Sequence, residues 1–374
     1  MKLFKKILVL GTMMSVLFCM CIGSASASTT PNVAINGSNI AISSSYGTPF
    51  IDSANRTMVP IRVVSENLGA KVAWDQSTQT ATINGSIKIK IGSNVIETTY
   101  GQITMDTKAV IKDSRTYIPF RFMGNALGYD VNWTDNTKTA NIITKSDLII
   151  SAAASLKNAM DEVQALYLEQ KPNANLSITY GGSGALQQQI EQGAPVDLFF
   201  SAAASNMNAL KGKDLLENST IKNLLQNKVV MITPSDSTLT ISSFKDVTNS
   251  SITHLALGEP TTVPAGKYAL QVFTYYNLAD QAKAKAVYAK DVTEVLTWVA
   301  SGNADAGVVY STDAASSDKV KVVATAPEDS HDPVTYPGAV LKSTKQPVAS
   351  QDFLNFLTSD KAKAVFVKYG FTVL

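Results

Sequence analysis

The stretch DLIISAAASLKNAM, residues 147–160, decides the fold class of the larger part of the chain. Its apolar run at 148–150 predicts a buried strand, and the small residues after it lead into a helix that we expect from about Ser155 to Gln170. Two more strands and a second helix are predicted downstream, at 176–180, 196–200 and 183–192. Strands that alternate with helices in this way indicate an α/β fold, with a mostly parallel sheet covered by helices on both faces.

A serine stands at the start of both predicted helices, directly after a strand: Ser155, and Ser183 in the run Gly181-Gly182-Ser183-Gly184. The first backbone N–H groups of a helix are unpaired and lie at the positive end of its dipole, so such a point can hold an anion without any charged side chain. The alternative is ordinary capping, in which each serine satisfies its own helix. Capping explains either serine alone better, so the anion-site interpretation depends on the other motifs.

Length and composition limit the class of protein. A chain of 374 residues is too long for one ordinary core and suggests two or three domains. Lys and Arg number 32 against 30 Asp and Glu, which provides no basic surface for nucleic acid. Two histidines leave little room for a zinc or di-iron site. We therefore expect no nucleic-acid partner and no metal cofactor.

Residues 1–27 are typical of a secretory signal, with lysines at the start, an apolar stretch and a small-x-small motif that ends at Ala27. We expect cleavage before Ser28 and a secreted protein. The alternative is an uncleaved membrane anchor, because the apolar stretch is nearly long enough to span a bilayer. Both cysteines, Cys19 and Cys21, lie in this segment, and the large residue before each argues against lipid attachment.

An internal repeat follows the signal. RTMVPIR at 56–62 matches RTYIPFR at 115–121 at a spacing of 59 residues, and the register continues through Trp74 and Trp133 without a gap. Each copy predicts a strand, a short helix and a hairpin.

The repeated pattern VPIR…LG…V.W, over about residues 31–145, resembles the small domain at the N-terminus of some copper amine oxidases, which also occurs as a stalk on exported proteins. The stretch contains no His and no Cys. Met58, Met105 and Met123 are better explained as core residues than as Cu(I) ligands, so we expect no copper. The resemblance implies a small α+β stalk domain.

Two arginines of this stalk could act on a partner. Arg62 and Arg121 are interpreted as structural ion-pair residues, with attachment to an anionic cell-wall polymer as the alternative. Only residues 144–146 separate the stalk from the next sheet, so we expect a short link and not a flexible tether.

Six stretches of the second region, in order, resemble the molybdate-binding proteins of bacterial molybdate ABC importers over about residues 147–374. They are DLIISAAASLKNAM, YGGSGALQQQIEQGAPVDLFFSA, LALGEPTTVPAGKYA, AKDVTEVLTWVASGNADAGVVYSTDA, VVATAPEDSH and AVFVKYGF. The resemblance implies the periplasmic-binding-protein fold: two α/β lobes, a hinge crossed twice, and the ligand in the cleft. Lobe one is then expected at about 147–228 and 318–374, and lobe two at about 229–317.

The resemblance also implies which residues hold the ligand. Ser155 and Ser183 match the family's two binding serines, in lobe one. In lobe two, Ala265 and Val292 match positions whose backbone N–H groups donate to the oxyanion, and Tyr310 matches the tyrosine whose hydroxyl completes the shell. The five would hold molybdate through its oxygens, without direct ligation of the metal. Glycines beside Ser183 depart from the family's serine cluster and are expected to loosen the loop.

This shell implies a transport function. Neutral donors without an acceptor discriminate tetrahedral dianions by cavity size, so molybdate and tungstate are expected to bind and the smaller sulfate is not. The chain would capture the ligand outside the cell and deliver it to a membrane permease driven by an ATPase. It would be neither an enzyme nor a cofactor-dependent protein.

Three alternatives stay open. The run from Gly181 to Ala185 is near the Gly-x-Ser-x-Gly motif of hydrolases, with His331 downstream, but the final glycine is missing and no acid is singled out for a triad. A cell-wall structural or adhesion protein with a degenerate binding domain is the second alternative. The third is a sulfate or phosphate binder of the same fold. Phosphate would require an acceptor for its proton, and no Asp or Glu is obvious beside Ser155 or Ser183.

Overall fold

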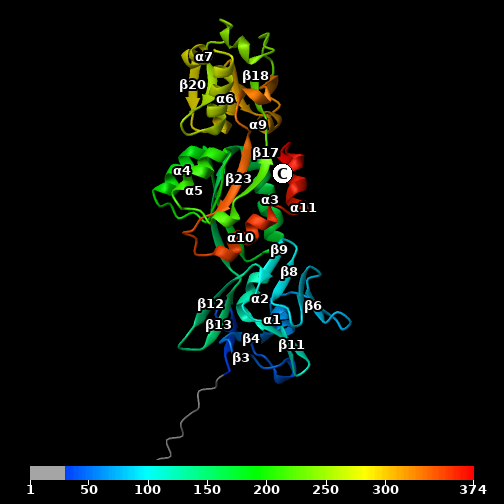
Figure 1. The fold of residues 1–374 in the computed structure, drawn as a ribbon. Helices are drawn as coiled ribbons and strands as arrows, with labels where there is room; N and C mark the ends of the chain where they lie inside the picture. The colour runs from blue at the N-terminus through cyan, green and yellow to red at the C-terminus, as the bar shows by residue number, and fades with distance from the viewer. Residues whose placement is uncertain (1–29) are drawn as a thin grey trace, which may run out of the picture.

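The computed structural model describes residues 30–374 and arranges them as three units in a row (Figure 1). The stalk domain lies at one end, lobe one in the middle and lobe two at the other end. The predicted signal, with Cys19 and Cys21, lies outside the described residues. None of the described helices is both long and apolar enough to cross a membrane.

The stalk consists of short strands and two short helices. The strands are β1 (Asn32–Ile35), β2 (Ser38–Asn39), β3 (Phe50–Ile51), β4 (Thr57–Pro60), β5 (Val72–Asp75), β6 (Thr80–Ile83), β7 (Ile87–Lys90), β8 (Val95–Thr98), β9 (Gly101–Thr104), β10 (Val110–Lys112), β11 (Arg115–Pro119), β12 (Asp130–Thr134) and β13 (Thr139–Ile143). The helices are α1 (Ile61–Asn67) and α2 (Phe120–Ala126), with a 3-10 turn η1 (Ser44–Tyr46). Three sheets result, in the orders β12-β13-β1-β2, β10-β11-β4-β3 and β5-β6-β7-β8-β9.

The sequence repeat folds as predicted. Strand β4, helix α1 and hairpin β5–β6 have the counterparts β11, α2 and β12–β13. The two copies meet where β4 pairs antiparallel with β11. Met58, Met105 and Met123 are all buried, which confirms that they fill apolar space.

Lobe one is built on the sheet that contains the stretch at 147–160. Its strands, in the order β15-β14-β16-β23-β17-β24, are β14 (Ser146–Ala153), β15 (Ala174–Gly181), β16 (Leu198–Phe200), β17 (Lys222–Gln226), β23 (Thr335–Val340) and β24 (Thr372–Val373). Its helices are α3 (Lys157–Gln170), α4 (Ser183–Glu191), α5 (Ala204–Gly212), α10 (Pro347–Phe356) and α11 (Asp360–Lys368), with 3-10 turns η2 (Ala154–Leu156) and η3 (Asn218–Thr220).

Successive residues of β16 show that both faces of this sheet are covered. Phe199 packs in the cluster that includes Leu186 of α4 and Met207 of α5. Phe200 points to the opposite face and packs at 6.4 Å, edge to face, against Phe353 of α10. Burial on both sides explains why β16 is a continuous apolar run.

Lobe two has a second sheet of five strands. Its strands, in the order β20-β19-β21-β18-β22, are β18 (Val229–Pro234), β19 (Leu255–Gly258), β20 (Ala286–Ala289), β21 (Ala306–Tyr310) and β22 (Val320–Thr325). Its helices are α6 (Pro264–Tyr275), α7 (Ala279–Lys285), α8 (Val292–Ala300) and α9 (Ser311–Ala315), with a 3-10 turn η4 (Phe244–Thr248).

Two expectations about these lobes are wrong. Lobe two does not end near residue 317, because β22 pairs along its length with β18 and so belongs to the lobe-two sheet. The sheets are also mixed instead of mostly parallel: β23 and β17 run antiparallel to their neighbours, as does β18. Both errors concern the strands next to the hinge. The chain leaves lobe one after β17 and enters lobe two at β18, and it leaves lobe two after β22 and returns to lobe one at β23.

The hinge consists of two crossings that lie side by side. The first runs from β17 through Asn227 and Lys228 into β18, and the second runs from β22 through η5 (Glu328–Ser330) to β23. The backbone N–H of Asn227 donates to the carbonyl of Val334 at 3.2 Å and so ties the crossings together.

Lobe one and the stalk are joined by hydrogen bonds and an ion pair. The Asp130 carboxylate of the stalk accepts hydrogen bonds of 3.2 Å from the N–H groups of Val348 and Ala349, in the first turn of α10. Lys171 of lobe one donates to the carbonyl of Leu127 at 2.7 Å and pairs with Asp352 at 3.1 Å. The link between β13 and β14 is short, as expected, but it is two residues long instead of three, because Ser146 already belongs to β14. The contacts above hold the stalk against lobe one.

Candidate functional site

A small pocket lies between the two lobes, where several helices begin. It is lined by Ala153, Ala154, Ser155, Gly181, Gly182, Ser183, Ala202, Val263, Pro264, Ala265, Val292 and Tyr310. All five residues predicted from the family resemblance are among them. Every one of these lining residues is uncharged, so the cavity offers only hydroxyl and backbone groups for recognition.

Ser183 is the first residue of helix α4 and is fully buried. It does not cap its own helix; its Oγ accepts a hydrogen bond of 3.0 Å from the N–H of Ala202, at the end of the neighbouring strand. That bond uses a lone pair and leaves the hydroxyl proton free to donate. The capping alternative for Ser183 is therefore wrong.

Ser155 lies in the 3-10 turn η2 and makes no capping bond either. Its Oγ shares a hydrogen bond of 3.0 Å with the phenol of Tyr336, on the hinge-side strand β23. The amide of Asn227 donates to the same phenol oxygen at 3.2 Å. Either hydroxyl can donate in the Ser155–Tyr336 bond, and when Tyr336 donates, the Ser155 proton is free for a ligand.

Tyr336 and Asn227 contact the predicted site, and sequence reasoning missed both. Asn227 also donates to Thr312 at 2.8 Å and accepts from Ser311 at 2.8 Å, which joins the first hinge crossing to helix α9 of lobe two. Tyr336 lies in an apolar strand and reads as core, and no motif marks either residue.

The hydroxyl of Tyr310 is the group that most directly indicates a ligand site. It is completely buried and has no hydrogen-bond partner among the described residues. Burial raises the pKa of this phenol well above its ordinary value, with smaller contributions from Tyr336 and Tyr268, so it stays protonated. A buried donor without an acceptor costs about 1–3 kcal/mol, and Tyr310 lines the cavity, so its proton is available to a ligand there.

Two backbone donors complete the set. Ala265 is the second residue of α6 and Val292 is the first residue of α8. At these positions a helix leaves its N–H groups unpaired, and neither group has a backbone acceptor among the described residues. With Ser183 at the start of α4, three helices therefore direct the positive ends of their dipoles at one cavity, which favours an anion there.

The glycines beside Ser183 have a structural role that corrects the expectation of a loose loop. A side chain at Gly184 would come within 2.7 Å of the backbone of Thr262, and one at Gly182 within 2.8 Å of the Lys290 carbonyl. Both contacts are with lobe two. The glycines therefore allow the lobes to approach closely around the cavity.

A buried carboxylate lies one turn beyond the cavity. Asp313 accepts a hydrogen bond of 3.1 Å from the N–H of Tyr310. Burial raises the pKa of Asp313 to about 7, the Tyr310 N–H lowers it, and the nearby Asp291 raises it further.

The hydrolase alternative finds no support in this geometry. Ser183 makes no hydrogen bond with His331 in the described part of the chain, and the Nδ1 of His331 instead lies 2.7 Å from the carbonyl of Asp332. Between residues 30 and 374, no group of three or more His, Cys, Asp or Glu side chains is placed to hold a metal ion.

Comparison with known families decides the class of the larger region. The family model for bacterial extracellular solute-binding proteins matches residues 148–372. The chain belongs to this family. In the stalk, residues 34–142 match the model of the copper amine oxidase N-terminal domain, which confirms the second resemblance.

Individual relatives of this solute-binding protein agree with that result. YvgL of Bacillus subtilis (strain 168), provisionally named an ABC transporter substrate-binding lipoprotein, is 41% identical over 64% of this chain and 91% of its own. The molybdate-binding protein ModA of Haemophilus influenzae is 39% identical over 60% of this chain and 89% of its own. Among solved structures, the periplasmic molybdate-binding protein of Azotobacter vinelandii has the same fold, with a TM-score of 0.55 and 23% identity over 61% of this chain and 99% of its own.

Proposed function

We propose that this protein captures molybdate outside the cell and delivers it to an ABC importer. The observation that carries the proposal is the buried Tyr310 hydroxyl, which has no hydrogen-bond partner within residues 30–374 and lies in a cavity lined by uncharged residues. The relatives named as molybdate-binding proteins support the same ligand.

Each predicted site residue receives a role in this proposal. Ser155 and Ser183 donate hydroxyl protons from lobe one. Ala265 and Val292 donate backbone N–H groups from lobe two, and Tyr310 donates its phenol proton. Because the donors come from both lobes, an oxyanion between them bridges the lobes and favours the closed form.

In this proposal the site selects among oxyanions by the size of the anion and by whether the anion carries a proton. A fully deprotonated tetrahedral dianion needs only donors, which matches the uncharged lining. Phosphate carries a proton at neutral pH and would need an acceptor, which this set of donors lacks. Sulfate has shorter bonds to oxygen than molybdate, so it would leave several buried donors unpaired at about 1–3 kcal/mol each. Tungstate is nearly the size of molybdate and is expected to bind as well.

Delivery requires partners that the family implies. The loaded, closed protein would dock on a membrane permease driven by an ATPase, on the outer face of the membrane or in the cell wall. The protein itself binds its ligand without chemical change. The stalk would act as a spacer, or as an attachment to cell-wall polymer, on the side of lobe one away from lobe two.

Isothermal titration of residues 28–374 with molybdate, tungstate and sulfate tests the ligand. The expected result is tight one-to-one binding of the first two and no heat from sulfate. Binding of sulfate alone would reassign the ligand within the same fold. Binding of none of the three would contradict the transport function and favour a structural protein with a degenerate cleft.

A further inference from the structure

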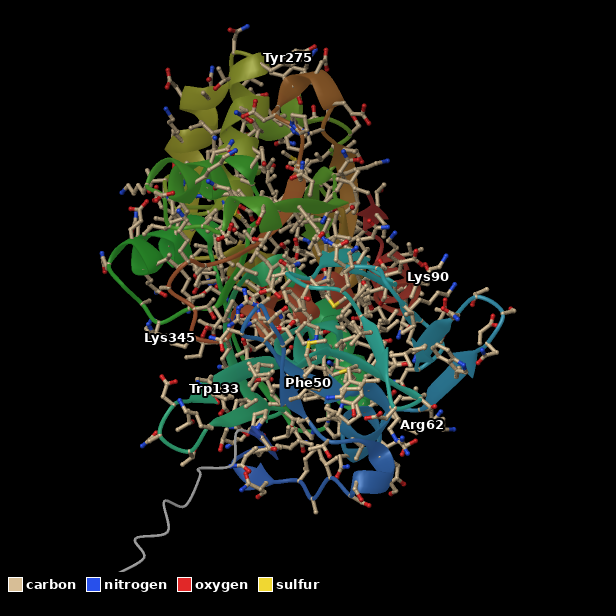
Figure 2. All side chains as sticks on the ribbon, turned by 60° about the horizontal axis from the view of Figure 1, so that its bottom comes forward. Phe50, Arg62, Lys90, Trp133, Tyr275 and Lys345 are labelled. Carbon is tan, nitrogen blue, oxygen red and sulfur yellow. The ribbon has the colours of Figure 1, made fainter. Side chains whose placement is uncertain are left out.

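A wide groove of about 960 Å³ lies in the stalk, far from the cavity between the lobes. It runs between the β12–β13 hairpin and strands β3 and β4, and Phe120, Arg121 and Phe122 at the start of α2 line it as well. Its volume falls within the range of small-molecule sites in proteins. Figure 2 shows Trp133 and Phe50 of this groove on the stalk, at the end of the molecule away from Tyr275 of lobe two.

Trp133 lines this groove with a partly exposed indole. Its side chain remains 40% exposed, although it is one of the largest apolar groups in the chain. The indole Nε1 donates to the Asp135 carboxylate at 2.8 Å, which restricts the orientation of the ring. An exposed indole held in one orientation is a suitable platform for a flat apolar surface, because little side-chain freedom is lost on binding.

Most charged side chains of the groove pair with one another. Arg56 pairs with Asp106 at 2.5 Å, and Asp135 accepts from Trp133 and lies 4.0 Å from the Nζ of Lys138. Arg121 is exposed and has neither an ion pair nor a hydrogen bond among the described residues. The expectation of a structural ion pair is therefore not met at Arg121.

The repeat supplies an internal comparison. Arg62, which corresponds to Arg121, pairs with Glu66 at 3.4 Å and donates to the Val72 carbonyl at 3.2 Å. The position of Glu66 is taken in the second copy by Asn125, which carries no charge. The second copy therefore has the arginine without the acidic partner that Arg62 has in the first copy. In Figure 2, Arg62 lies apart from Trp133, with Phe50 between them.

We propose that this groove binds an anionic saccharide of the cell wall, with a sugar ring on Trp133 and an acidic group on Arg121. A pyranose ring has a face of C–H groups that packs on an indole, and its hydroxyls suit the amides of Asn55 and Asn132, which also line the groove. A guanidinium pairs with a carboxylate or a phosphate through two parallel hydrogen bonds. This inference rests on the attachment role proposed above and assigns it to one site and one class of ligand.

The experiment measures retention of the mature chain, residues 28–374, on purified bacterial peptidoglycan, with its teichoic acid either retained or removed. Trp133→Ala and Arg121→Ala are compared with Trp74→Ala and Arg62→Ala, the corresponding changes in the first copy. We expect the second-copy changes to weaken retention at least tenfold and the first-copy changes to leave it within twofold. Titration with molybdate on the same variants must give unchanged affinity, which separates this proposal from the transport function. Unchanged thermal unfolding of each variant must show that its stalk is folded.

The two wall preparations identify the source of the anionic group. Loss of retention on removal of teichoic acid assigns the ligand to its phosphate groups, and unchanged retention assigns it to the peptidoglycan glycan. No retention on either preparation, or equal losses in both copies, would overturn the proposal.

Discussion

Gly184 of lobe one donates its backbone N–H to the carbonyl of Thr262 in lobe two, at 2.8 Å. This hydrogen bond joins the two lobes directly beside the cavity. Lys267 of lobe two also reaches Ser205 of lobe one, at 3.3 Å. The two lobes are therefore in direct contact beside the cavity. The backbones meet closely at Gly184 because this residue has no side chain.

Replacement of Gly184 should prevent this approach. In Gly184→Ala the new methyl group would lie 2.7 Å from the Cα of Thr262, and a backbone contact of that kind cannot be relieved by rotation of a side chain. We expect molybdate affinity to fall at least tenfold and the compaction on ligand addition, measured by small-angle scattering, to disappear. Gly212→Ala is the matched control, because no atom lies within 4 Å of its added methyl group. Full affinity in Gly184→Ala would show that binding does not require this closure.

Removal of the Tyr310 hydroxyl should separate binding from stability. The hydroxyl has no partner in the described structure, so Tyr310→Phe removes an unsatisfied buried group and should leave the melting temperature equal or slightly higher. The ligand loses one charge-assisted hydrogen bond, worth about 1.5–3 kcal/mol, so affinity should fall roughly 10- to 150-fold. Tyr288→Phe, on the exposed surface of lobe two, should change neither quantity. A large loss of stability in Tyr310→Phe would assign the hydroxyl a structural role instead.

Asp313 should make the stability of lobe two depend on pH. Its pKa is raised from 3.8 to about 7, mainly by burial, so the folded protein holds this proton more tightly than the unfolded chain. The stabilising effect of the proton is complete below about pH 4 and is lost as the pH rises through about 7. Asp313→Asn should therefore show a smaller fall in melting temperature between pH 4 and pH 8 than the native protein. Parallel curves for the two proteins would contradict the assignment.

The sequence predicts the parts of this molecule that depend on local pattern. The repeat, the strand at 148–150 and the convergence of Ser155 with Ser183 follow from periodicity and family motifs. Ile149 is 39% exposed, so this strand is not buried on both faces as its apolar run suggested. Contacts made across the hinge cannot be predicted from such patterns. Tyr336 reaches Ser155 from 181 residues away and reads locally as a core residue, so no pattern marks its hydroxyl as a partner.

The boundary of lobe two and the role of the glycines were mispredicted for the same reason. Strand β22 is assigned to lobe two by its pairing with β18, about 90 residues earlier in the chain, and not by its own composition. From the sequence alone, Gly184 is expected to make the loop flexible. The structure shows that its lack of a side chain allows the backbone of Thr262 to pack against it. The assignment of β22 and the role of Gly184 both depend on how the two lobes are arranged, which is seen only in the three-dimensional structure.

The final prediction concerns the joint between the stalk and lobe one. The ammonium of Lys171 pairs with Asp352 at 3.1 Å, donates to the Leu127 carbonyl and lies 4.5 Å from the ring centre of Tyr129. The two paired side chains are only 17% and 20% exposed, so Lys171→Ala leaves a largely buried carboxylate without its cation.

Such a loss costs about 1–3 kcal/mol, and we expect Lys171→Ala to lower the melting temperature by a few degrees and to speed proteolysis at the link around residues 144–145. Lys145→Ala is the control at the same joint, because its ion pair with Asp147 is 3.8 Å long and exposed to water, where such pairs contribute little. Molybdate affinity should be unchanged in both variants, since neither residue lines the cavity between the lobes. If Lys171→Ala weakened molybdate binding while the melting temperature stayed the same, the stalk would be coupled to the site and would not be a passive support.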